Sequence, residues 1–267
     1  MAEPETYEVL ALKYARHAER TRRDNFLLAD DHASPQPIDY YVWVVRNERH
    51  TILVDTGFDR VEAQARDRVL EREPREALEM VGIPADQIET VVISHLHYDH
   101  AGTLDRFPAA RFHIQEAEMA FATGRCMCDE IVRRPFTADH VCGLVRKVYA
   151  GRVTFHDGDG AIAPGVTVHH VPGHSKGLQC VRVLTGTGWV VLAADSTHLY
   201  ENFEQRKPFP IVVDVEATLR SYDRLERLAT SRRHIVPGHD PLVLQRYPAL
   251  NPRTEGVVHR VDVARLD

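Results

Sequence analysis

The chain has 267 residues, of which 43% are hydrophobic and 27% charged, a composition typical of a globular protein with one large domain or at most two. Its net charge of −6 provides no general attraction to phosphate backbones, which disfavours nucleic acid as a partner. No apolar run approaches the roughly 20 residues that cross a bilayer, so we expect no membrane-spanning segment.

The first part of the chain is expected to form an antiparallel pair of strands. Two apolar and aromatic runs at 40–45 and 51–54 flank the polar residues 46–50, a pattern typical of a hairpin. A mixture of Ala, Glu, Arg and Leu then predicts a helix over 61–81, and Pro84 marks the turn after it. Residues 90–94 are β-branched and apolar, which predicts a buried strand.

The middle of the chain carries weaker signals. A short strand is predicted at 112–114, followed by helices at 116–122 and near 141–148. Pro135 and two cysteines, Cys126 and Cys128, lie between these helices. Because the segment 116–150 falls between candidate ligands, it is a candidate lid over a site, the alternative being a simple connection.

From residue 153 the chain becomes strongly β. Apolar runs predict a second sheet with strands at 153–155, 166–171, 178–184 and 189–194. A helix over 215–230 with one apolar face and a short strand at 234–236 follow. Sheets flanked by helices predict an α/β layered fold, with residues 1–267 forming one domain.

The cysteines and the start of the chain bear on the cellular compartment. No CxxC spacing is present among the four cysteines, which are Cys126, Cys128, Cys142 and Cys180. The initial residues Met1–Glu5 do not resemble a signal peptide. We therefore expect free thiols and a cytoplasmic protein.

The strand at 90–94 runs directly into the most informative motif, HLHYDH. It places four side chains that bind metals within six positions: His95, His97, Asp99 and His100. Imidazole nitrogens and carboxylate oxygens are the ligands of zinc and similar cations. Chance clustering is the alternative in a chain with 16 histidines, but the pattern HxHxDH after an apolar strand favours a metal site.

Three further candidate ligands each follow an apolar strand and lie beside a turn or loop. They are His174 in VPGHSKG, Asp195 in VVLAADS and His239 in IVPGHD. Loops at strand ends can converge on one site. Together with the first four, these side chains are sufficient for two metal ions with a position left open for solvent.

This ordered set of motifs resembles the metallo-β-lactamase superfamily, whose early aspartate-bearing turn is similar to Asp55-Thr56-Gly57. The resemblance implies an αββα sandwich with a two-metal site at the edge of its sheets. It also implies that His95, His97 and His174 bind one ion, that Asp99, His100 and His239 bind the second, and that Asp195 bridges them. Asp55 is expected to orient a ligand histidine by a hydrogen bond, or else only to end a strand.

Other histidines lie close to the motifs but are not assigned to the metals. Strand alternation turns at least one of His169 and His170 away from the site, and His234 is left out as well.

The resemblance also indicates the reaction. Two cations lower the pKa of a bridging water, so hydroxide can attack a carbonyl without a separate base. Asp195 resembles the bridging aspartate of acyl homoserine lactonases and glyoxalase II. Only a short tail follows His239, which disfavours the glutathione-binding region of glyoxalase II. We expect a hydrolase that opens a small lactone such as an N-acyl homoserine lactone.

Substrate contacts are expected from three residues near the ligands. The segment after Asp195 resembles the lactonase pattern, except that His198 stands where that family places a substrate-facing tyrosine. His198 is predicted to be catalytic and to bind substrate as a hydrogen-bond donor, the alternative being a structural role. Tyr98 and Tyr200 are further candidates for binding substrate, and Asp99 is assigned a catalytic role in addition to its role as a ligand.

Alternative functions differ in substrate or chemistry. The same fold could hydrolyse a thioester, an amide or a cyclic amide. A flavin-linked diiron redox module is disfavoured because His97 stands where those relatives commonly carry glutamate. A nucleic-acid-processing member is disfavoured by the acidic balance. Zinc is the expected cation, although manganese, cobalt and iron accept the same ligands, and a homodimer is compatible with the sequence.

Overall fold

The central strands of the first sheet carry apolar side chains on both faces because both faces are covered. In β2 (Ile38–Arg46), Tyr41, Trp43 and Val45 face the second sheet, whereas Val42 and Val44 face a separate core beneath the helices. This alternation follows from the two-residue period of a strand. The computed structural model describes residues 5–28 and 31–267.

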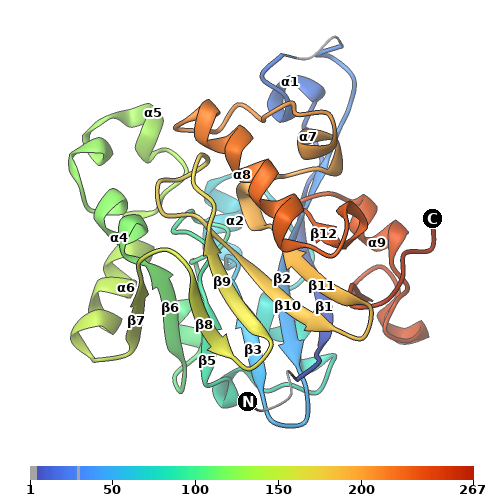
Figure 1. The fold of residues 1–267 in the computed structure, drawn as a ribbon. Coiled ribbons are helices and arrows are strands. Elements are labelled where there is room, and N and C mark those ends of the chain that lie inside the picture. The colour runs from blue at the N-terminus through green and yellow to red at the C-terminus, as the bar shows by residue number, and fades with distance from the viewer. Residues whose placement is uncertain (1–4, 29–30) are drawn as a thin grey trace.

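Within the described residues, two sheets form the centre of the fold (Figure 1). The first has the order β13-β1-β2-β3-β5-β6-β7, with β4 beside β1. Its strands besides β2 are β1 (Glu8–His17), β3 (Thr51–Val54), β4 (Val69–Leu70), β5 (Thr90–Val92), β6 (Arg111–Gln115), β7 (Val153–His156) and β13 (Val258–Arg260). The second has the order β12-β11-β10-β9-β8. Its strands are β8 (Gly160–Ala163), β9 (Val166–His170), β10 (Gln179–Thr185), β11 (Gly188–Leu192) and β12 (Ile235–Val236).

Helices cover the outer faces of both sheets. In Figure 1, α8 lies over the second sheet and α6 over the first. Tyr222 and Leu225 of α8 pack on the second sheet, and Val141 and Leu144 of α6 pack on the first. The helices are α1 (Arg22–Asn25), α2 (Arg60–Ala65), α3 (Pro74–Glu79), α4 (Glu116–Ala122), α5 (Glu130–Arg133), α6 (Ala138–Tyr149), α7 (Tyr200–Glu204), α8 (Val215–Leu228) and α9 (Leu242–Arg246). The predicted αββα sandwich is therefore confirmed.

Most predicted elements are confirmed, but the helix over 61–81 is wrong. The chain instead forms α2, the short strand β4 and α3. Asp67 adopts a left-handed conformation with φ of 56°, and Pro74 stands in the first turn of α3. Proline lacks the N–H that a helix interior requires, so it begins a new helix rather than continuing the first.

The prediction that the strand at 153–155 belongs to the second sheet is also wrong. They form β7, which pairs in parallel with β6 at the edge of the first sheet rather than joining the second. The second sheet contains β8 in its place, paired with β9 across a register shift between Ala161 and Ala163. Strands β1, β8 and β13 were not predicted.

No helix within the described ranges has both the length and the apolar character needed to cross a bilayer. All four cysteines are free thiols, as predicted. The start of the chain, used in the signal-peptide argument, lies largely outside the described residues, which begin at Glu5.

Candidate metal centre

The HLHYDH loop begins where β5 ends at Val92. The backbone N–H of Ser94 donates to Asp55 Oδ1 at 2.7 Å, and its hydroxyl donates to Asp55 Oδ2 at 2.8 Å. Asp55 follows β3, the neighbouring strand, and has a φ of 61°. These bonds tie the start of the loop to the adjacent strand end and hold it at the edge of the first sheet.

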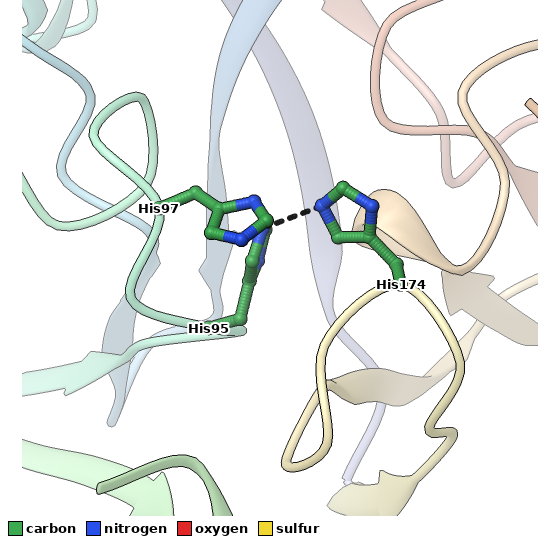
Figure 2. Close-up of side chains that lie close together, drawn as sticks. All are labelled: His95, His97 and His174. Carbon is green, nitrogen blue, oxygen red and sulfur yellow. Dashed lines mark hydrogen bonds between the residues drawn. The ribbon is translucent and has the colours of Figure 1, made fainter. Parts of the chain in front are cut away.

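Three imidazoles form the first group of side chains, called here the three-histidine group: His95, His97 and His174 (Figure 2). His95 and His97 come from the loop after β5, and His174 comes from the turn between β9 and β10. The Nε2 atoms of His95 and His174 lie 3.1 Å apart. The ring centroids of His97 and His174 are 4.5 Å apart, so the three rings face a common point.

A second group combines carboxylates and imidazoles and is called here the aspartate–histidine group: Asp99, His100, Asp195 and His239. Asp195 Oδ1 lies 2.9 Å from His239 Nε2 and 3.2 Å from His100 Nε2. Its other oxygen, Oδ2, lies 3.2 Å from His174 Nε2. Asp195 therefore stands between the two groups. All seven side chains are buried, with exposed fractions between 0 and 7%.

Asp195 and His239 reach the centre from neighbouring strands of the second sheet. Asp195 follows β11 and His239 follows β12, and these two strands pair in parallel, so their carboxyl ends meet. Gly238 allows this close approach. A Cβ at this position would lie 2.7 Å from Ala194 O and 2.8 Å from Asp195 Oδ1. Any larger residue would separate the two loops.

The outer nitrogens of the histidines show that the inner ones are free to bind a cation. His174 Nδ1 donates to Ile211 O, His239 Nδ1 to Asp39 O and His100 Nδ1 to Asp55 Oδ2. His95 Nδ1 donates to Ser94 Oγ, whose own hydrogen is given to Asp55. A proton on Nδ1 leaves the lone pair on Nε2, and such outer bonds are typical of metal-binding histidines.

Several nitrogen and oxygen atoms that face the centre of the two groups have no hydrogen-bond donor or acceptor to match them. With Nδ1 protonated, the His95 and His174 Nε2 lone pairs face each other across 3.1 Å. Among the described residues, His100 Nε2 and Asp195 Oδ1 are buried without a hydrogen-bond partner of suitable geometry. Unpaired buried polar atoms are costly, and a cation between them would satisfy both groups. The side chains present therefore fit divalent metal ions.

For His95, His97 and Asp195 the electrostatics favour the protonation states that ligands require. The pKa values of His100 and His239 are instead raised, because the carboxylates of Asp195 and Asp99 outweigh the lowering caused by burial. Burial, followed by the neighbouring imidazoles, lowers the pKa of His95 well below its usual value, so this ring stays neutral. Burial and His174 do the same for the pKa of His97. Burial would raise the pKa of Asp195, but His239 and His100 outweigh it and hold this pKa well below the usual range. Neutral imidazoles and an ionised carboxylate are the metal-binding forms.

Comparison with known proteins identifies the family to which this arrangement belongs. Residues 36–239 match the family model described as the metallo-beta-lactamase superfamily, which covers all seven side chains. The chain belongs to the metallo-beta-lactamase superfamily.

Relatives within the superfamily are similar over most of their length. An N-acyl homoserine lactonase of Bacillus thuringiensis is 30% identical over 216 residues, covering 75% of this chain and 80% of that protein. A crystal structure of a quorum-quenching N-acyl homoserine lactone hydrolase has a TM-score of 0.70 at 25% identity, covering 89% and 94% of the two chains. Another hydrolase structure, with N-hexanoyl-L-homoserine at its catalytic metal center, has a TM-score of 0.76 at 22% identity, covering 92% and 98%.

The residues predicted to contact substrate in this superfamily member, His198, Tyr98 and Tyr200, lie at different distances from the two groups. His198 is buried, with Nε2 2.9 Å from Asp195 Oδ2 and its ring stacked on Phe209 at a centroid distance of 3.5 Å. The Tyr98 hydroxyl lies 3.0 Å from the Tyr40 hydroxyl and accepts a hydrogen bond from Arg68 Nε at 3.1 Å, next to the ligand loop.

Tyr200 is not brought to the centre. Its ring lies between the guanidinium groups of Arg246 and Arg265, at 4.1 and 4.5 Å, and its backbone N–H donates to Asp240 Oδ2. Its hydroxyl is buried, and no hydrogen-bond partner for it is found among the described residues. A role for Tyr200 in binding substrate stays a prediction that these contacts do not support.

The histidines left out of the ligand set also lie elsewhere. His169 pairs with Asp159 at 2.9 Å, His170 Nε2 contacts Lys176 O, and His234 bonds to Ser231. None of the three belongs to a group that could hold a metal within the described residues.

Sequence reasoning missed several residues that support the ligands. The carbonyl groups of Asp39 and Ile211 accept from two ligand histidines, and a backbone acceptor leaves no signature in a sequence. Ser94, between Asp55 and two histidines, was read only as the end of a strand. Asp55 was expected to orient a ligand histidine; the structure shows its hydrogen bond to His100, whose role as a ligand stays a prediction.

Replacing Asp55 with asparagine should weaken metal binding about 10–100-fold, because support of a ligand from the outer side contributes on that scale. Asparagine tolerates the left-handed backbone of residue 55, but it has one acceptor oxygen, so its NH₂ group would face either the Ser94 backbone N–H or the Ser94 hydroxyl and His100. Competition with a chelator measures the affinity. Asp59→Asn, which removes a similar charge at the start of α2, is the control. Unchanged affinity in Asp55→Asn would contradict this role.

Proposed function

We propose that this chain is a dinuclear metal hydrolase that opens the ring of a small lactone, of the N-acyl homoserine lactone class or close to it. The arrangement of Asp195 between the three-histidine and aspartate–histidine groups supports the two-metal chemistry. The 30% identity to an N-acyl homoserine lactonase supports the substrate class. Zinc is the cation we propose, and manganese, cobalt and iron accept the same ligands.

His95, His97 and His174 would hold one cation, Asp99, His100 and His239 the other, and Asp195 would contact both. When bound, the two ions lower the pKa of water and polarise a carbonyl group. Ring opening joins the water oxygen to the carbonyl carbon, breaks the ring C–O bond and moves a proton from the attacking water to the departing oxygen. We assign that proton transfer to Asp99, whose Oδ2 lies 3.7 Å from His239 Nε2.

We assign His198 the role of donating a hydrogen bond to the substrate carbonyl oxygen, whose negative charge grows during attack. Its ring lies between those of His174 and His239, with centroid distances of 5.4 and 4.8 Å, so it reaches both groups. Stacking on Phe209 fixes the plane of the ring. In the structure Nε2 contacts Asp195, so the substrate oxygen must compete with this carboxylate for the hydrogen. Tyr98 would line the edge of the site beside the ligand loop.

The test is a screen of metal-loaded protein, with the metal content measured, against matched lactones, thioesters, esters and cyclic amides. Release of acid is followed for each. We expect turnover of the lactone to exceed that of the others by at least about tenfold, the scale on which one well-fitted contact discriminates. Turnover of the thioester with an inert lactone would favour the alternative of a thioesterase. Oxygen reduction by iron-loaded protein would favour the redox alternative.

Replacing His198 with phenylalanine should lower turnover about 100-fold, the lower end of what a positioned proton donor contributes. Phenylalanine can keep the stack on Phe209 but has no hydrogen to donate. Metal content should stay unchanged, and His198→Tyr, which restores a donor, should recover part of the turnover. Because His174, Asp195 and His198 also lie close enough to share a cation, loss of metal from His198→Phe would instead identify a ligand.

A further inference from the structure

One buried carboxylate outside the metal centre connects the two loops that carry the three-histidine group. Glu118 lies in α4, and its side chain has no exposed surface. Oε1 accepts from the backbone N–H of Leu96 at 2.9 Å, and Leu96 stands between His95 and His97. Oε2 accepts from the backbone N–H of Gly177 at 2.9 Å and from the Ser175 hydroxyl.

The turn after His174 packs closely against α4 at this point. A Cβ on Gly177 would lie 2.0 Å from the backbone nitrogen of Glu118, so only glycine fits here. The Lys176 ammonium lies 5.4 Å from the ring centroid of Phe121, also in α4. The helix therefore contacts the His174 turn at several successive residues, while Glu118 alone among these contacts also reaches the His95–His97 loop.

The contacts of Glu118 differ from those that orient each ring. His174 is oriented through Ile211 O and His95 through Ser94 Oγ, whereas Glu118 bonds to the backbone of the loops. Three donors face its two oxygens. Glutamine has the same shape but one acceptor oxygen, so its amide NH₂ would face a backbone N–H or a hydroxyl. Charge and acceptor number, rather than size, are what this position requires.

We propose that Glu118 is a positioning residue that sets the spacing between His95–His97 and His174, and thereby the affinity of the three-histidine group for its cation. The inference rests on the proposed two-metal function. No hydrogen bond joins Glu118 to the aspartate–histidine group within the described residues, so the second cation should be bound as before. A residue that only stabilised the fold would not weaken one cation selectively.

The test compares Glu118→Gln with Glu116→Gln, an exposed glutamate in the same helix. Zinc per chain is measured by mass spectrometry during competition with a chelator, and cobalt-loaded protein is followed by visible absorption. We expect Glu118→Gln to bind one cation about 10–100-fold more weakly and the other normally. Its cobalt spectrum should approach that of His97→Ala, which lacks a ligand of the three-histidine group. Glu116→Gln should match the unaltered protein.

Two cations bound with normal affinity by Glu118→Gln, or equal weakening of both, would overturn the proposal. If Glu118→Gln does not fold, Ser175→Ala decides, since it removes one donor to Oε2 and leaves the carboxylate in place. Selective weakening of one cation, smaller than tenfold, is then expected, and no change would overturn the proposal. These measurements use no substrate, so a failure of the lactonase assignment would not affect them.

Discussion

Asp195→Ala should abolish hydrolysis, with a loss of about 1,000-fold or more, because metal ions supply several kcal/mol to such reactions and each 1.4 kcal/mol is tenfold in rate. Asp195 Oδ1 faces His239 and His100, and Oδ2 faces His174, so one substitution removes a ligand from both groups. Turnover of the lactone and bound metal per chain are the measurements. His97→Ala should have a similar effect on turnover but should lose only one cation.

The fold should survive both changes, which thermal unfolding and circular dichroism can show. Asp262→Ala provides a matched control, since Asp262 is also a buried aspartate but pairs with Arg260, outside the candidate ligand groups. We expect it to lower stability and leave turnover per folded chain unchanged. Full activity in either Asp195→Ala or His97→Ala would show that the ligand assignment is wrong.

Removal of metal by a chelator should abolish turnover and lower the melting temperature by roughly 10 °C. A ligand at 1,000 times its dissociation constant stabilises a protein by about 4 kcal/mol, and each kcal/mol shifts the melting temperature of a chain of this size by about 2–4 °C. The cause lies in the buried, unpaired nitrogens and oxygens of the two groups. Scanning calorimetry before and after chelation measures the shift.

Added zinc should restore both properties, whereas magnesium should not, because it prefers oxygen ligands and most of the seven side chains offer nitrogen. Chelated protein with full turnover would contradict the two-metal proposal. A restored melting temperature without restored turnover would separate metal binding from the proposed reaction.

The sequence was most informative where side chains and strand ends coincide. HLHYDH follows an apolar strand, and His174, Asp195 and His239 follow others, so the pattern of strands and ligands alone indicated a shared site. The prediction of one helix over 61–81 was wrong because it relied on composition and ignored Pro74. Proline has no N–H and so does not fit in a helix interior.

Long-range relations were the harder part. Strand β7 follows the pattern of its neighbours in the second sheet, yet it pairs with β6, and nothing local distinguishes the two sheets. Tyr200 seemed close to the site because it follows Asp195 by five residues, but α7 turns its ring toward Arg246 and Arg265. Glu118 acts on loops about 20 and 60 residues away, a relation that only the fold reveals.

The origin of the proposed ligands has a consequence for kinetics. His95, His97, Asp99 and His100 follow a strand of the first sheet, while His174, Asp195 and His239 extend from the second. Neither sheet alone presents a complete site, so a cation can be captured tightly only after the two have docked. Release of metal should accordingly be slow and should accelerate with separation of the sheets. Metal-loaded protein should therefore resist denaturant for far longer than its equilibrium stability implies.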